Sequence, residues 1–435
     1  MVAKDRCHAA QRMLSRPWCA DAFLKDIIVQ LVEKPHSVAR LIVNFSGIKE
    51  LYNDFRSKTT EPVKISKAIK DLAFAPQRYS SEAKVLARLV LTWDSCLAIL
   101  TSVPTMRGPR SPEGAACLET LRFLDNEKML QLGMLADSAL ELHRVVKDLD
   151  SDNFDEAEFP AELDLYKQIL NKLFVDGLCL TVPGMTKLML GYLQQPRSVL
   201  VADVAKTLGG NAEDPVMRHQ CLKRMAAYTV VAEAVMNGEF PSFELMGCFK
   251  VFSVSDEAKS KQRSQSGELQ NCLQRLAQVI NVCPATLQYE FQNFYPLAAK
   301  YGKQGLRTFE AWKKAIEVTA KRRASHSTDA LLPVLARLGA WSCSSSSVER
   351  GFGIALASKQ LGQGQDEHLP SEESVLIIQQ DILQGSAAQD RDFRQVIFKA
   401  KTIWASSCAR VRASGDTKHK TRWDKCVART GTHCV

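Results

Sequence analysis

The apolar positions along the chain recur mainly at helical spacing. In residues 128–149 they step by three or four residues, which places them on one face of a helix: Leu135, Ala139, Leu142, Val146 and Leu149. The same spacing predicts helices over 163–173, 269–280 and 331–338. These segments supply enough one-sided apolar surface to form a helical core.

Alternation typical of strands is rare. RLIVNF (40–45) and FKVFSV (249–254) are short and fit either a strand or a helix. Polar, Gly-rich and Pro-rich stretches interrupt the pattern and predict breaks between helices at 104–114, 150–160, 253–268 and 362–374. The sequence therefore predicts a mainly α body.

Composition agrees with a globular protein. Of the 435 residues, 46% are hydrophobic and 24% charged. No apolar run approaches the length of about 18 residues that a membrane span needs, and the first twenty residues lack the apolar block of a signal peptide, so we expect no membrane association. Thirteen cysteines are scattered without CxxC pairs; Cys96, Cys179 and Cys221 have apolar neighbours and are expected to be buried, reduced thiols.

Positive charge is concentrated at the end of the chain. Residues 399–435 carry nine Lys or Arg against two Asp, and so supply +7 of the net charge of +9. Such a segment fits two interpretations: a solvated tail with little to bury, or an arm that binds nucleic-acid phosphates. The candidate nucleic-acid-binding residues are Lys399, Lys401, Arg410, Arg412, Lys418, Lys420 and Arg422.

Common catalytic and metal-binding motifs are absent from the sequence. One segment, residues 341–352, remains as a candidate for a functional site. In WSCSSSSVERGF (341–352), Ser346 and Glu349 have the spacing of a helix capping box, in which each side chain accepts from the other residue's backbone N–H. Val348 and Phe352 would then share one face of the following helix. Spacing favours the cap over a catalytic carboxylate, because one Glu binds a divalent ion poorly.

The same segment also resembles a family motif. LLPVLARLGAWSCSSSSVERGF (331–352) followed by LPSEESVLIIQQDI (369–382) is similar to the C-terminal region of hAT-superfamily transposases, with matches at Ser347 to Arg350 and at Phe352. Upstream, PWCADAFLKDI (17–27) and QRYSSEAKVLARLVLTWDSCLAIL (77–100) resemble further segments of that family in the same order. Ala22 replaces the family's histidine, and Gln77 replaces its threonine.

The resemblance implies a mainly α chain with an incomplete RNase H-like (α/β) core remnant and a large helical insertion. It also implies a divalent-metal site, normally Mg²⁺, formed by two Asp and one Glu. Glu349 matches the Glu, whereas little sequence precedes Cys19 and neither Asp has a match. We therefore expect this chain to bind no cofactor of its own and to lack autonomous strand transfer.

Domain organisation and partners also follow from the resemblance. It implies an N-terminal RNase H-like remnant (1–103), a helical insertion (104–325), a C-terminal dimerisation region (326–385) and a basic tail (386–435). The expected partners are a second copy or a related transposase chain, and DNA; the expected location is the nucleus, with the cytoplasm as the alternative. The expected dimer or core residues are Leu331, Leu335, Leu338, Val348, Phe352, Val375, Ile377 and Ile378.

Three interpretations of function stay open at this point. The chain is a transposase-derived protein that acts through dimerisation and DNA association; or it is part of an active transposase, with Glu349 catalytic in the longer protein; or it is an unrelated helical scaffold with a capping box at Ser346.

Overall fold

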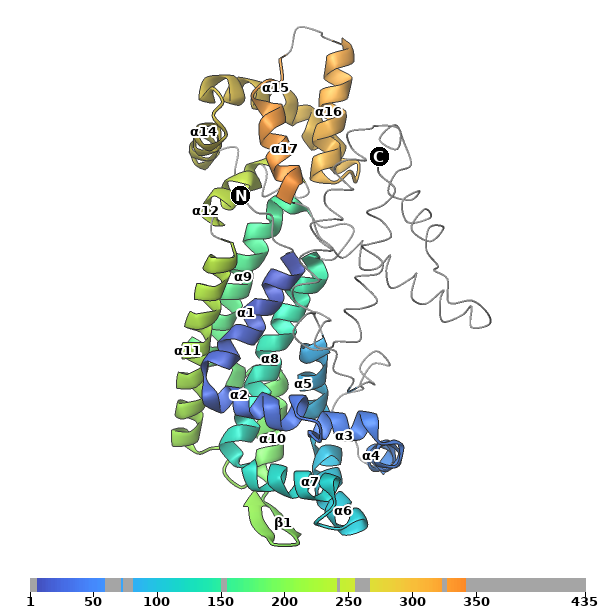
Figure 1. Ribbon diagram of the computed structural model, residues 1–435. Coiled ribbons are helices and arrows are strands. Elements are labelled where there is room, and N and C mark those ends of the chain that lie inside the picture. The colour runs from blue at the N-terminus through green and yellow to red at the C-terminus, as the bar shows by residue number, and fades with distance from the viewer. Residues whose placement is uncertain are drawn as a thin grey trace, which may run out of the picture. The chain divides into compact units, whose positions relative to one another are not determined.

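A computed structural model describes residues 6–58, 72, 81–149, 155–240, 243–254, 267–322 and 327–341. The chain divides into two units, Met1–Ser346 and Ser347–Val435, and all described residues lie in the first. They are mainly helical, which confirms the mainly α prediction (Figure 1).

The first part of the unit is built around one large hydrophobic cluster. Its α-helices are α1 (Arg6–Ala20), α2 (Ala22–Ile28), α3 (Val38–Asn44), α4 (Ser46–Lys58), α5 (Ser81–Leu91), α6 (Trp93–Arg107), α7 (Pro112–Phe123), α8 (Asn126–Leu149), α9 (Phe159–Leu170), α10 (Met185–Gln194), α11 (Pro215–Glu239) and α12 (Phe243–Gly247). Short π and 3-10 turns lie between them: η1 (Val29–Glu33), η3 (Glu156–Glu158), η4 (Asn171–Val175) and η5 (Leu178–Leu180).

Helix α8 is the centre of this first core. It packs against α1, α5, α9, α10 and α11 (Figure 1). Its predicted apolar face, including Leu135, Ala139 and Leu142, is buried. Asp137 on the same helix fixes α10, because its carboxylate accepts from the backbone N–H groups of Met185 (2.7 Å) and Thr186 (2.9 Å). A helix that contacts so many others must be buried on most sides, as α8 is.

The sheet consists of a single antiparallel hairpin within the described ranges. Strands β1 (Arg197–Val201) and β2 (Val204–Leu208) pair in the register Val201↔Val204, so the turn contains only Ala202 and Asp203. Between residues 6 and 103, the described segments form helices and turns without a strand. The two ambiguous apolar runs are also helical: 40–45 lies mostly in α3 and 249–254 mostly in η6 (Cys248–Phe252).

A second hydrophobic cluster contains η6 and the last described helices. These are α14 (Glu268–Ile280), α15 (Pro284–Lys303), α16 (Thr308–Arg322) and α17 (Leu331–Trp341). Trp312 of α16 lies at its centre, with its ring 5.3 Å from that of Phe252 and 5.4 Å from that of Phe291. Aromatic contacts thus join α16 to η6 and α15.

No single helix in the part of the chain that the structure describes is long and apolar enough to cross a membrane. Among these described residues, one pair of helical segments, Ala83–Leu91 and Trp93–Arg107, has such a length and composition when taken together, and it is bent by 81° at the break. Both segments belong to the first core, where Val85, Leu89 and Ile99 are buried.

Candidate nucleic-acid interface

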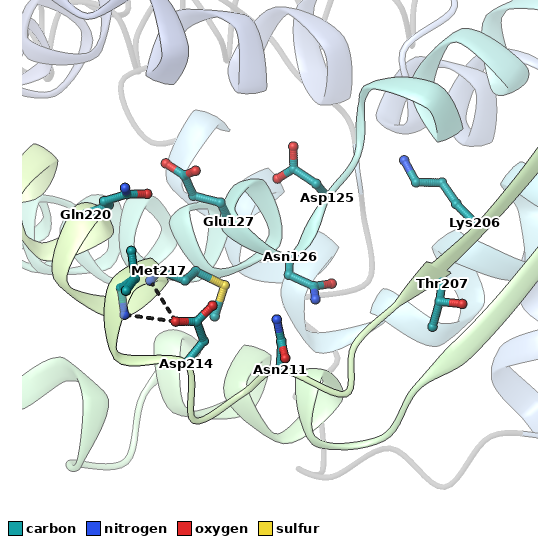
Figure 2. Close-up of a pocket in the computed structure, with 10 residues that line it drawn as sticks. Asp125, Asn126, Glu127, Lys206, Thr207, Asn211, Asp214, Met217 and Gln220 are labelled. Atoms are coloured by element: carbon teal, nitrogen blue, oxygen red, sulfur yellow. Dashed lines mark hydrogen bonds between the residues drawn. The ribbon is translucent and has the colours of Figure 1, made fainter.

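A hollow lies where the hairpin meets the N-termini of α8 and α11 (Figure 2). It is open and holds about 360 Å³. Several of its polar side chains have structural partners. Asp214 caps α11 by accepting from Val216 N (2.9 Å) and Met217 N (3.3 Å), and Asn126 exchanges two hydrogen bonds with the backbone of Gly209.

Lys206 in the same hollow caps the C-terminus of α7. Its ammonium group donates to the carbonyl oxygens of Leu121 (2.7 Å), Arg122 (3.2 Å) and Leu124. These carbonyls end α7, where a cation is favoured by the helix dipole. Partial burial lowers the pKa of Lys206. The hollow therefore brings together groups that fix the hairpin and helix ends, and it shows no nucleophile paired with a base among its described residues.

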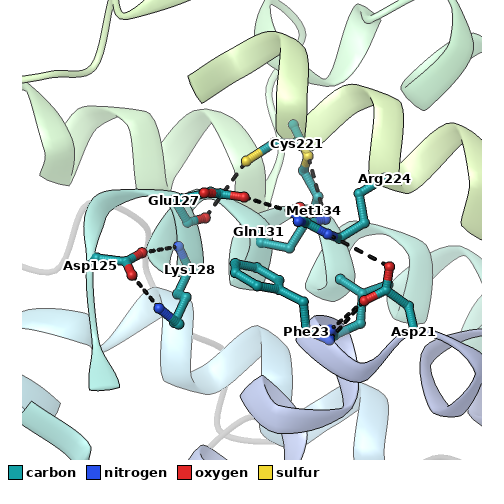
Figure 3. A network of polar contacts seen from close by, with 10 residues as sticks. Asp21, Phe23, Asp125, Glu127, Lys128, Gln131, Met134, Cys221 and Arg224 are labelled. Carbon is teal, nitrogen blue, oxygen red and sulfur yellow. Dashed lines mark hydrogen bonds and ion pairs between the residues drawn. The ribbon is translucent and has the colours of Figure 1, made fainter. Parts of the chain in front are cut away.

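A polar network beside this hollow has the same structural character (Figure 3). The Arg224 guanidinium lies over the Phe23 ring at 3.8 Å from its centroid and pairs with Glu127 at 2.6 Å. Arg224 also lies 3.6 Å from Asp21, which caps α2 by accepting from Phe23 N at 2.8 Å. One arginine of α11 thus joins α2 and α8 by a cation–π contact and two ion pairs.

A strongly charged surface instead lies at the α15–α16 corner. Lys300 and Lys303 end α15, Arg307 lies in the turn, and Lys313 and Lys314 follow in α16; all five side chains are exposed. We call these five residues the α15–α16 cationic surface. Residues 300–314 contain a single acid, Glu310, and an excess of positive charge over 15 residues is the electrostatic feature of a phosphate-binding face.

The corner is held by close packing of its turn. Gly305 has φ of +89°, a conformation that side chains disfavour, and a Cβ on Gly302 would lie 2.6 Å from the carbonyl oxygen of Val254. Thr308, the first residue of α16, accepts from Val254 N (3.2 Å) and donates to the Asp155 carboxylate (2.7 Å). These contacts fix the end of α15 against the start of α16.

Arg307 and Lys314 of this surface contact neighbouring side chains. Arg307 forms an ion pair with Glu310, and the hydrogen bond from Arg307 lowers the pKa of that carboxyl. Lys314 lies with its ammonium group 4.8 Å from the Tyr301 ring centroid. Both are surface contacts, so they leave the cations accessible to an anionic partner. In the sequence, this surface is visible only as the net charge of +4 in residues 300–314, which is smaller than the +7 of the tail.

The sequence-predicted site residues fall into two groups. Leu331, Leu335 and Leu338 of α17 are buried within the chain, as members of the second core. Outside the described residues lie Glu349, Val348, Phe352, Val375, Ile377 and Ile378, the capping box at Ser346, and the seven candidate nucleic-acid-binding residues of the tail: Lys399, Lys401, Arg410, Arg412, Lys418, Lys420 and Arg422.

The three cysteines expected to be buried thiols are confirmed as such. Cys96, Cys179 and Cys221 are buried and free, and burial raises the pKa of each thiol to about 12. Within the described ranges, no three His, Cys, Asp or Glu side chains are grouped so that they could hold a metal ion. Comparison with protein-family models, with curated proteins and with solved structures finds no match to this chain.

Proposed function

We propose that the chain derives from a hAT-like transposase and acts through dimerisation and DNA association rather than through strand transfer of its own. The proposal includes an RNase H-like remnant near the N-terminus and a nuclear location. It rests on sequence segments that resemble family motifs and follow one another in the same order. Among the residues of the family's metal site, Glu349 matches the Glu, and neither Asp has a match in this sequence. A mainly helical body agrees with a large helical insertion.

The observation that carries the DNA part of this proposal is the α15–α16 cationic surface. It presents five exposed cations from two helices and the turn between them, and Thr308 and Gly302 fix the relative position of these helices. Cations on a rigid support release condensed counterions from DNA without the cost of ordering a flexible segment. The basic tail at 399–435 would add a second, sequence-independent contact.

Replacing Lys300, Lys303, Lys313 and Lys314 together with glutamine should weaken binding of the full chain to duplex DNA. Each lost phosphate contact reduces the slope of log K against log salt by about 0.9, so the slope should fall by about 3 to 4. Fluorescence anisotropy over a salt series measures this change. The same samples with Mg²⁺, run on a gel, report strand cleavage, which we expect to be absent.

A matched variant controls for net charge: Lys25, Lys49, Lys84 and Lys187 are exposed lysines on four other helices. Changing these four to glutamine should leave the salt slope within about 1 of the unmodified chain. Equal slopes for both variants would overturn the assignment of the surface. Cleavage that requires Glu349 would instead favour an active transposase.

The proposed dimer interface uses those candidate apolar residues that are not already packed in the second core. Because Leu331, Leu335 and Leu338 pack within the chain, the proposed interface consists of Val348, Phe352, Val375, Ile377 and Ile378. An Asp at such a position would bury an unpaired charge in the interface.

We expect the double change Ile377→Asp and Ile378→Asp to convert a dimer into a monomer, as measured by light scattering at micromolar concentration. Leu332→Asp is the control, since Leu332 on α17 is 49% exposed and should tolerate a charge. An unmodified chain that is monomeric under these conditions would contradict the dimer proposal.

A further inference from the structure

The segment formed by α12 and η6 lies against α14 in an antiparallel register. Glu244 and Arg275 form an ion pair at 2.7 Å, and Lys250 forms another with Glu268. From the first pair to the second, the residue number increases along α12 and η6 and decreases along α14, so the two segments run antiparallel. This register places Cys248, which lies between the two ion-paired residues of its segment, opposite Cys272.

The two thiols are in contact at this position. Cys248 and Cys272 are both buried members of the second core, and their side chains hydrogen-bond to each other. Cys248 also lies 3.5 Å from the carbonyl oxygen of Glu244. Two free thiols from different elements are thus held together by flanking ion pairs and by the core.

The environment separates the two thiols chemically. The hydrogen bond with Cys272, with a smaller contribution from the nearby Arg275 and Lys250, lowers the pKa of Cys248 below that of a free thiol. The same hydrogen bond, together with burial, raises the pKa of Cys272. The shared hydrogen bond thus favours a Cys248 thiolate that accepts from the Cys272 thiol, which pairs a nucleophile with a resolving group.

We propose that Cys248 and Cys272 form a redox modification site that a hydroperoxide converts into a disulfide, joining η6 to α14. The proposal rests on the register, the burial and the contact of these two residues, and it is independent of the proposed role in DNA association. No other pair among the described cysteines combines contact between thiols with two flanking ion pairs.

The reaction balances with the peroxide as the oxidant. The Cys248 thiolate attacks one peroxide oxygen, an S–O bond forms, the O–O bond breaks, and the leaving hydroxide becomes water on protonation. The Cys272 sulfur then attacks the Cys248 sulfur. The S–S bond forms, the S–O bond breaks, and the departing oxygen leaves as water with the Cys272 proton. Two thiols and one hydrogen peroxide thus give one disulfide and two waters.

Peptide mapping of the full chain after brief exposure to hydrogen peroxide tests this proposal. We expect a cross-linked peptide pair that joins Cys248 to Cys272, lacks two hydrogen atoms, and disappears on addition of a thiol reductant. It should form at least about tenfold faster than oxidation at Cys96, Cys117 or Cys221, because burial raises the pKa of each of those thiols to about 12.

The variant Cys272→Ser supplies the second measurement. Without its resolving partner, Cys248 should stay as a sulfenic acid that a dimedone-type reagent labels, whereas Cys248→Ser should abolish labelling at this pair. A folded, unmodified chain that forms no Cys248–Cys272 cross-link would overturn the proposal, and so would dimedone labelling of Cys272 in preference to Cys248. Neither result would affect the DNA-binding measurement.

Discussion

Replacing Trp312 with alanine should lower the free energy of unfolding by about 3–5 kcal/mol, the range for a fully buried aromatic residue. Trp312 is buried completely, and its ring contacts those of Phe252, Phe291 and Tyr295. The indole N–H also donates to the carbonyl oxygen of Phe252 at 2.8 Å. The change therefore creates a large cavity and leaves a buried acceptor without its partner.

Urea unfolding followed by far-ultraviolet circular dichroism measures this loss. Tyr289→Ala is the matched control, because this aromatic residue lies on neighbouring α15 but is 61% exposed. The control should change stability by less than about 0.5 kcal/mol. A loss below about 1 kcal/mol for the Trp312 variant would show that the second core is not organised around this ring.

The second large effect is expected from Glu290→Ala. Glu290 is 1% exposed, and its carboxylate accepts from Ala330 N (3.1 Å), Leu331 N (2.7 Å) and the Ser327 hydroxyl (2.9 Å). A side chain on α15 thus caps the N-terminus of α17, where negative charge is favoured. Removing it leaves two buried backbone donors unsatisfied at about 1–3 kcal/mol each, so we expect a total loss of about 2–6 kcal/mol.

Amide hydrogen exchange at Leu331 reports this change locally, and urea unfolding reports it globally. Protection at Leu331 should fall in Glu290→Ala and recover in part in Glu290→Gln, whose amide oxygen still accepts. Glu317→Ala on the exposed side of α16 serves as the control and should stay within about 0.5 kcal/mol of the unmodified chain. Unchanged protection in Glu290→Ala would show that α17 does not depend on this cap.

Helices with long apolar periodicity were predictable from the sequence. Residues 128–149 and 269–280 correspond to α8 and α14, because a one-sided apolar pattern at this spacing can be buried only as a helix. The hairpin at 197–208 was not predicted. Its two-residue turn places Ala202 at φ of 51°, without the Gly or Asn that normally marks such a turn.

The candidate site was less predictable than the fold. The charge of residues 300–314 is visible in the sequence, but its exposure on one fixed corner depends on the packing of Val254 against Gly302. The contact between Cys248 and Cys272 depends on the register of α12 and η6 against α14, which two ion pairs report and no local pattern encodes. Contacts of this kind join segments distant along the chain, and local spacing carries no information on them.

The two cores differ in how far apart along the chain their contacts lie. In the first core, the ion pair between Arg12 and Glu239 spans 227 residues, whereas every fully buried apolar residue of the second core except Ala157 lies between 248 and 338. Because closing a short loop costs less entropy than closing a long one, contacts within 248–338 should form sooner during folding. On a ribosome, α1 must wait for α11 to emerge, whereas α14 to α17 emerge together and can pack at once.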